Sequence, residues 1–128
     1  MTRTALLIED NEQNRYLASF LLKQHGYEVI AVAHGRAALE VLADFVPDVI
    51  LLDIQLPGMD GYDVARRLRE LDSLRNVPII AVTSYAMVGD REKSIAAGCN
   101  GYIEKPIDPE TFIREIEQVR VSAGESPL

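Results

Sequence analysis

The chain has 128 residues, of which 48% are hydrophobic, and its 13 basic and 20 acidic side chains give a formal charge of −7. This length suits a single globular domain with its own core, and the acidic balance argues against direct nucleic-acid binding. No run approaches the roughly 20 apolar residues of a membrane span, and the first residues do not resemble a signal peptide, so we expect a cytoplasmic protein without membrane contacts.

Short apolar runs alternate with longer amphipathic segments along the whole chain. The runs at 5–8, 29–32, 49–52, 79–82 and 102–103 have the length and spacing of strands. Between them, apolar residues recur at helical spacing in the groups Leu17-Phe20-Leu21, Ala38-Val41-Leu42-Phe45, Val64-Leu68-Leu71 and Phe112-Ile116-Val119. A weaker helix is expected over 87–97. The pattern predicts an α/β domain of five strands and five helices.

Turn and cap residues support this division. Gly26 follows the first helix, Pro47 and Pro78 precede strands, and Asp108-Pro109 has the form of an N-cap and first turn of the last helix. The runs at 5–8, 49–52 and 79–82 lack alternation, as expected for central strands covered on both faces. Right-handed crossovers then predict a flavodoxin-like, doubly wound parallel sheet of order 2-1-3-4-5. We expect the domain to span 1–122 and a flexible C-terminal tail to span 123–128.

Two other features carry little functional signal. Cys99 is the single cysteine, so no intrachain disulfide is possible, and we expect it to be a small buried hydrophobe. Arg66, Arg67 and Arg69 form a local basic cluster, which we interpret as a solvated helix face.

Acidic residues follow the first and third strand-like runs. In the predicted strand order these strands are neighbours, which brings Glu9, Asp10 and Asp53 together. Crowded carboxylates repel one another unless a cation joins them, and oxygen ligands suit Mg²⁺. We expect Asp10 and Asp53 to be direct ligands, with Gln55 contributing its backbone carbonyl and Glu9 holding a metal-bound water.

Asp53 is also a candidate nucleophile toward phosphorus. Aspartyl phosphates are known covalent intermediates, and phosphoryl transfer depends mainly on positioning and charge neutralisation. Lys105, after the last strand, would balance the charge of the phosphoryl oxygens, and Thr83, ending the fourth strand, would donate its hydroxyl to one of them.

Four segments resemble the receiver domain of two-component response regulators, the CheY-like superfamily. They are Leu7-Ile8-Glu9-Asp10-Asn11, the run 51–61 that contains Asp53 and Pro57-Gly58, the run 78–83 that ends in Thr83, and Tyr102-Ile103-Glu104-Lys105-Pro106. The resemblance implies that Asp53 accepts a phosphoryl group from a histidine kinase or a histidine phosphotransfer protein. It also implies that Glu9 and Asp10 handle Mg²⁺ and that Thr83 and Lys105 contact the phosphoryl group.

The same resemblance identifies Tyr102 as the switch aromatic, which rotates inward when Thr83 is drawn toward the phosphoryl group. Gln55 and Tyr85 should flank that group. Tyr85 would obstruct the water that hydrolyses the acyl phosphate, and Gln55 has no carboxylate to act on it, so we expect a long-lived phosphorylated state.

The segments 86–90 and 97–99 are similar to those of stand-alone regulators of the cell-division (DivK-like) type and of receivers in hybrid histidine kinases. We expect a single-domain regulator that signals to a downstream protein. Its binding face would be formed by the fourth helix, fifth strand and fifth helix, around Ile95, Tyr102, Ile113 and Glu117.

Two other functions remain open at this point. A phosphatase of the aspartate-nucleophile class also combines Asp, Thr, Lys and Mg²⁺, but it usually needs an acid two residues after the nucleophile, where this chain has Gln55. Flavin-nucleotide binding on a similar sheet would require phosphate-cradling groups after the first strand, where this chain has Glu9, Asp10 and Asn11.

Overall fold

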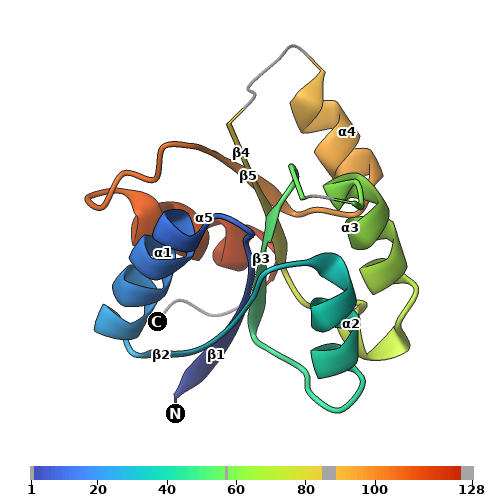
Figure 1. Ribbon diagram of the computed structural model, residues 1–128, viewed down its shortest axis with the longest axis horizontal. Coiled ribbons are helices and arrows are strands. Elements are labelled where there is room, and N and C mark those ends of the chain that lie inside the picture. The colour runs from blue at the N-terminus through green and yellow to red at the C-terminus, as the bar shows by residue number, and fades with distance from the viewer. Residues whose placement is uncertain (1, 57, 85–88, 125–128) are drawn as a thin grey trace.

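The computed structural model describes residues 2–56, 58–84 and 89–124, in which strands and helices alternate (Figure 1). Within these ranges the structure confirms the predicted five strands and five helices and adds one 3₁₀ helix, η1. In chain order they are β1 (Arg3–Ile8), α1 (Glu12–Gln24), β2 (Tyr27–Val32), α2 (Gly35–Leu42), β3 (Val49–Asp53), α3 (Gly61–Arg69), η1 (Asp72–Leu74), β4 (Ile79–Thr83), α4 (Asp90–Ala96), β5 (Gly101–Glu104) and α5 (Phe112–Ser122).

The strands form one parallel sheet of order β2-β1-β3-β4-β5, as the sequence predicts. Ile8 of β1 pairs with Leu52 of β3, and Asp53 pairs with Val82 of β4. The carboxyl ends of these three strands are therefore level with one another. Residues that follow them in the chain start from the same edge of the sheet.

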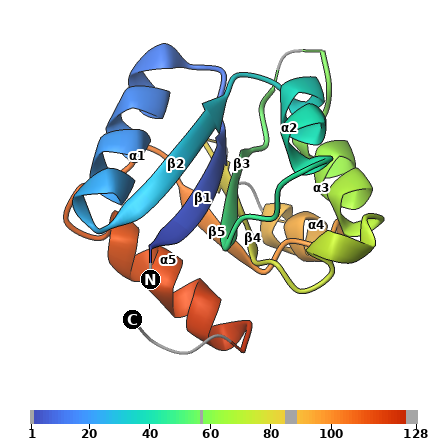
Figure 2. The same ribbon diagram turned by 90° about the horizontal axis from the view of Figure 1, so that it is seen from below.

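Helices cover both faces of the sheet. Figure 2 shows α1 and α5 on one side and α2, α3 and α4 on the other. Every residue of β3 and β4 is buried, which confirms the expectation for central strands covered on both faces. Two apolar clusters result, one under each helical layer. At about 1.5–3 kcal/mol for each large aliphatic side chain buried, these clusters supply the main stabilisation of the sheet.

Local signals begin three of the helices. The side chains of Asn11, His34 and Asp60 accept backbone N–H groups in the first turns of α1, α2 and α3. At the start of α3, a Cβ on Gly61 would lie 2.4 Å from the Cα of Ile54. Only glycine lets α3 begin so close to the end of β3.

The predicted start of α5 is three residues too early. The helix begins at Phe112, while the Asp108 carboxylate accepts the Glu110 N–H and caps a preceding turn. A second correction concerns α1, where Phe20 is 49% exposed and the buried face is formed by Ala18, Leu21 and Leu22. Phe20 lies about 100° around the helix from Leu21, which places it at the margin of the apolar stripe. Leu71, predicted to continue the stripe of α3, is 36% exposed and follows the helix end.

The interpretation of the arginine cluster is wrong for one of its members. Arg66 and Arg67 are exposed, but Arg69 is partly buried. Its guanidinium donates to the carbonyl of Gly98 at 2.8 Å and to the carbonyls of Leu74 and Val77 at 2.7 Å. Its guanidinium also bonds the Asn100 side chain. Arg69 thereby joins the segments that precede β4 and β5, at the sheet edge opposite Asp53.

Cys99 is 5% exposed, which confirms the expected buried hydrophobe, and burial raises the pKa of its thiol to about 11. Within the described residues, no helix combines the length and the apolar character needed to cross a bilayer. Of the expected tail, Ala123 and Gly124 form a turn after α5, and the remaining residues lie outside the described ranges.

Candidate functional site

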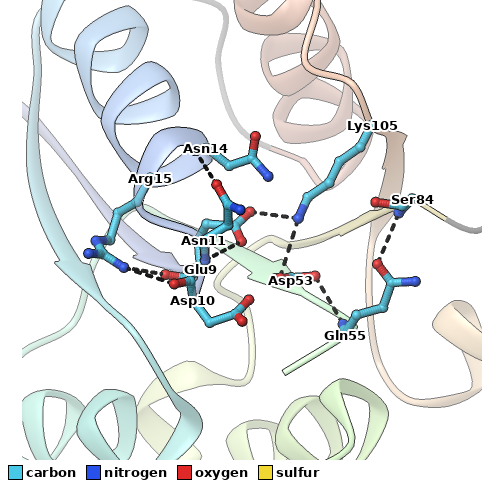
Figure 3. A network of polar contacts seen from close by, with 9 residues as sticks. All are labelled: Glu9, Asp10, Asn11, Asn14, Arg15, Asp53, Gln55, Ser84 and Lys105. Atoms are coloured by element: carbon cyan, nitrogen blue, oxygen red, sulfur yellow. Dashed lines mark hydrogen bonds and ion pairs between the residues drawn. The ribbon is translucent and has the colours of Figure 1, made fainter. Parts of the chain in front are cut away.

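Three carboxylates meet where β1 and β3 end. Glu9 and Asp10 follow β1 and Asp53 ends β3, and each offers an oxygen within 4.8 Å of the other two (Figure 3). Glu9 and Asp53 are only 3% and 2% exposed, whereas Asp10 lies open to solvent. The cluster therefore combines two buried acids with one that faces solvent.

Lys105 places an ammonium group in this cluster. Its Nζ lies 2.8 Å from Glu9 Oε1 and 3.3 Å from Asp53 Oδ2. The backbone N–H of Lys105 donates to the Thr83 carbonyl at 2.8 Å, which fixes the residue beside the end of β4. Among the residues that the structure describes, the cluster combines this ammonium with three carboxylates, so its fully ionised form carries an excess of two negative charges.

Backbone groups hold the acids in place. The second Glu9 oxygen accepts the Asn11 N–H at 3.1 Å, and Asp53 Oδ1 accepts the Gln55 N–H at 2.9 Å. The Arg15 guanidinium donates to the Glu9 carbonyl at 3.0 Å and to the Asp10 carbonyl at 3.4 Å. These two contacts from α1 stabilise the turn between β1 and α1 (Figure 3).

The crowding disfavours the ionised acids. Desolvation and the neighbouring Glu9 carboxylate raise the pKa of Asp53 above its usual range, against the opposing influence of the Gln55 N–H and Lys105. The pKa of Asp10 is also raised, by desolvation and by its proximity to Asp53. A divalent cation between these oxygens would relieve both effects, and an all-oxygen donor set with exposed positions suits Mg²⁺.

Thr83 and Gln55 complete the edge of the site. Thr83 ends β4, is 2% exposed and lies opposite Glu104 in the sheet, one residue before Lys105. The Gln55 side-chain carbonyl accepts the Ser84 N–H at 3.3 Å, linking the ends of β3 and β4. The structure therefore brings Glu9, Asp10, Asp53, Gln55, Thr83 and Lys105 to one edge of the sheet. Tyr85, expected to flank this site, lies outside the described residues.

Sequence reasoning did not find the roles of Arg15 or Ser84. Arg15 lies in the second turn of α1, close to the positive end of the helix dipole, where a cation is ordinarily unfavourable. That placement is a weak signal of a specific partner, and the two carbonyls supply it. Ser84 had no signal, because it contributes only its backbone N–H.

A groove of about 370 Å³ lies between α4, β5 and α5, at the predicted partner face. It is lined by Arg91, Ile95, Tyr102, Glu115, Gln118 and Val119, among others. Ile95 is 58% exposed, and Tyr102 is half-buried against the core. Glu117, predicted to belong to this face, instead accepts the Tyr27 hydroxyl at 2.6 Å and pairs with the buried Arg120. It is therefore engaged within the domain.

Comparison with known proteins agrees with this geometry. The sequence model named response regulator receiver domain matches residues 5–117. The polar-differentiation response regulator DivK of Brucella ovis is 43% identical over 117 residues, which cover 91% of this chain and 95% of that protein.

Solved structures give the same assignment. The chemotaxis response regulator CheY4 of Vibrio cholerae superposes with a TM-score of 0.89 at 28% identity, covering 93% of this chain and 99% of that one. The receiver domain of a sensor histidine kinase from Pseudomonas aeruginosa PAO1, solved with a magnesium ion coordinated in its active site cleft, gives 0.85 at 36% identity, covering 94% and 99%. The chain therefore belongs to the response regulator receiver domain family.

Proposed function

We propose that Asp53 accepts a phosphoryl group from a phosphohistidine of a histidine kinase or a histidine phosphotransfer protein, in cytoplasmic two-component or phosphorelay signalling. The observation that carries this proposal is the environment of the Asp53 carboxylate. It lies buried at a strand end, with one oxygen held by the Gln55 N–H at 2.9 Å and the other facing the Lys105 ammonium at 3.3 Å. An oriented carboxylate beside a cation is suited to attack phosphorus.

In the transfer step, an Asp53 oxygen forms a bond to phosphorus while the bond from phosphorus to the donor imidazole nitrogen breaks. The electron pair of that bond returns to the imidazole. Lys105 balances the charge on the transferred oxygens, and the Thr83 hydroxyl donates to one of them. Later attack by water on phosphorus returns the free carboxylate and inorganic phosphate. Gln55 offers no base for that water, so we propose that the hydrolysis is slow.

The acidic cluster fits Mg²⁺ because a cation would compensate its two excess negative charges and would oppose the raised pKa values of Asp10 and Asp53. One carboxylate oxygen of Glu9 is already paired with the Lys105 ammonium, and the other accepts the Asn11 N–H. Asp10 and Asp53 are therefore the proposed direct ligands, with the Gln55 carbonyl as a third and Glu9 acting through water. When bound, Mg²⁺ would neutralise charge on the phosphoryl oxygens.

We propose that the output of this reaction is a change at the groove between α4, β5 and α5. Drawing the Thr83 hydroxyl toward the phosphoryl group vacates space into which Tyr102 rotates, and Tyr102 lines the groove. A downstream protein would bind there, with Ile95 as an exposed apolar anchor. The two other functions considered from the sequence have no support in the site, since Gln55 occupies the position of the phosphatase acid and carboxylates follow β1.

Intact mass after incubation with acetyl phosphate and Mg²⁺ tests the proposal. Wild type should gain the mass of one phosphoryl group, and Asp53→Asn should gain none. Asp44→Asn, which changes an exposed acid far from the cluster, is the matched control and should label like wild type. Label on Asp53→Asn, or no label on wild type, would refute the assignment.

A further inference from the structure

Gln55 contacts both the acceptor loop and the end of β4. Its backbone N–H donates to Asp53 Oδ1 at 2.9 Å, and its side-chain carbonyl accepts the backbone N–H of Ser84 at 3.3 Å (Figure 3). Ser84 directly follows Thr83, the residue proposed to bind the phosphoryl group. Gln55 therefore links the loop after Asp53 to the end of β4 through its backbone and its side chain.

The carboxamide has only one orientation that satisfies this contact. Because the Ser84 N–H is a donor, the oxygen of Gln55 must face it, which turns Nε2 the other way. Nε2 is buried there and has no hydrogen-bond partner among the described residues. A buried amide nitrogen without an acceptor is unfavourable. At 3.3 Å, the bond that maintains the orientation is longer than the usual range for N–H···O contacts.

We propose that Gln55 is a positioning residue whose carboxamide holds the Ser84 N–H in the unphosphorylated domain and releases it when Asp53 is phosphorylated. This inference rests on the proposed function. The phosphoryl group places charged oxygens at the end of β3, and these compete for nearby donors more strongly than a neutral carbonyl does.

The contact therefore stabilises the unphosphorylated state and adds to the cost of activation. A ligand shifts such an equilibrium only through its differential affinity for the two states.

Replacing Gln55 with Met keeps the length of the side chain and removes the acceptor. The Ser84 amide proton should then exchange with water several-fold faster, since Ser84 is exposed. Beryllofluoride, a phosphoryl mimic, should bind about three- to tenfold more tightly in the presence of Mg²⁺.

Gln55→Glu provides the opposite change, because it keeps an acceptor, makes it charged and removes the unpaired Nε2. Its Ser84 amide should exchange more slowly than in wild type. Gln24→Met, at the exposed end of α1, is the matched control and should change neither quantity. Water-exchange NMR on ¹⁵N-labelled protein measures the first quantity, and chemical-shift titration with beryllofluoride measures the second.

Unchanged Ser84 exchange in Gln55→Met would overturn the inference, as would unchanged or weaker beryllofluoride binding by that variant. The exchange measurement without ligand does not depend on phosphorylation. Failure of the inference is therefore separable from failure of the proposed function, which would appear as wild type taking no label from acetyl phosphate.

Discussion

The ammonium of Lys105 lies 2.8 Å from the carboxylate of Glu9, and the two side chains are only 9% and 3% exposed. The same ammonium is 3.3 Å from Asp53. Lys105 is thus an ion-pair partner of two buried acids before any phosphoryl group is present. Removing one member of a buried ion pair leaves the charge of the other uncompensated.

Replacing Lys105 with Met should therefore lower the free energy of unfolding by about 3 kcal/mol at neutral pH without Mg²⁺. Urea denaturation in EDTA measures this loss. Adding Mg²⁺ should recover part of it, because the metal compensates the same carboxylates. Lys23→Met, at an exposed position on α1, should cost far less. Equal losses for the two variants would show that the buried pairing contributes nothing.

Asp53→Asn should stabilise the domain in the absence of Mg²⁺. The pKa of Asp53 is raised in the folded state, chiefly by desolvation, so its ionised form destabilises the fold and its protonated form does not. The gain should be present in full at pH 7, where the Asp53 carboxylate of wild type is ionised. It should shrink as the pH falls through the pKa of Asp53, because wild type then becomes neutral as well. Urea unfolding of wild type and Asp53→Asn at neutral and at acidic pH measures the difference in their free energies of unfolding. A difference that does not change with pH would contradict the prediction.

Tyr27→Phe should destabilise the domain although it removes a single oxygen. The Tyr27 hydroxyl donates to Glu117 at 2.6 Å and accepts from the Arg120 guanidinium at 2.5 Å. Arg120 is 1% exposed, so loss of that acceptor costs about 1–3 kcal/mol. Tyr16→Phe is the matched control, since Tyr16 is 75% exposed, and thermal denaturation should separate the two. A similar melting temperature for both variants would exclude a stabilising network.

Cys99 should resist alkylation in the native state. Its thiol is 5% exposed, and burial raises its pKa to about 11, so little reactive thiolate is present near pH 8. Iodoacetamide should modify the protein rapidly in urea and only slowly in buffer, as measured by intact mass. Modification at equal rates would show that the segment between α4 and β5 opens readily.

The sheet and the position of the acidic cluster could be predicted from sequence because both follow from short-range patterns. Unbroken apolar runs identified β1, β3 and β4, and parallel pairing brings the residues after them to one edge. Asp53, Glu9 and Lys105 were found in this way. Their pairing distances depend on side-chain packing and could not be obtained from spacing.

Long side chains were predicted least well. The sequence pattern placed Arg69 on a solvated face and Glu117 on the partner face, but both bond to groups distant in sequence. Phe20 shows the complementary error, since an apolar residue was assigned to the core and lies half-exposed. Where a flexible side chain ends depends on which carbonyls, hydroxyls or apolar groups the rest of the fold brings within its reach.

Arg69 has a mechanical consequence for α4. Its guanidinium holds the carbonyl of Gly98, just beyond the C-terminal end of that helix, and the Asn100 side chain before β5. The N-terminal end of α4 lies toward the opposite edge, where β4 ends at Thr83. Arg69 therefore fixes the C-terminal end of α4 to the segments that precede β4 and β5. These contacts should restrain the C-terminal end of α4 whenever a change at Asp53 displaces the helix.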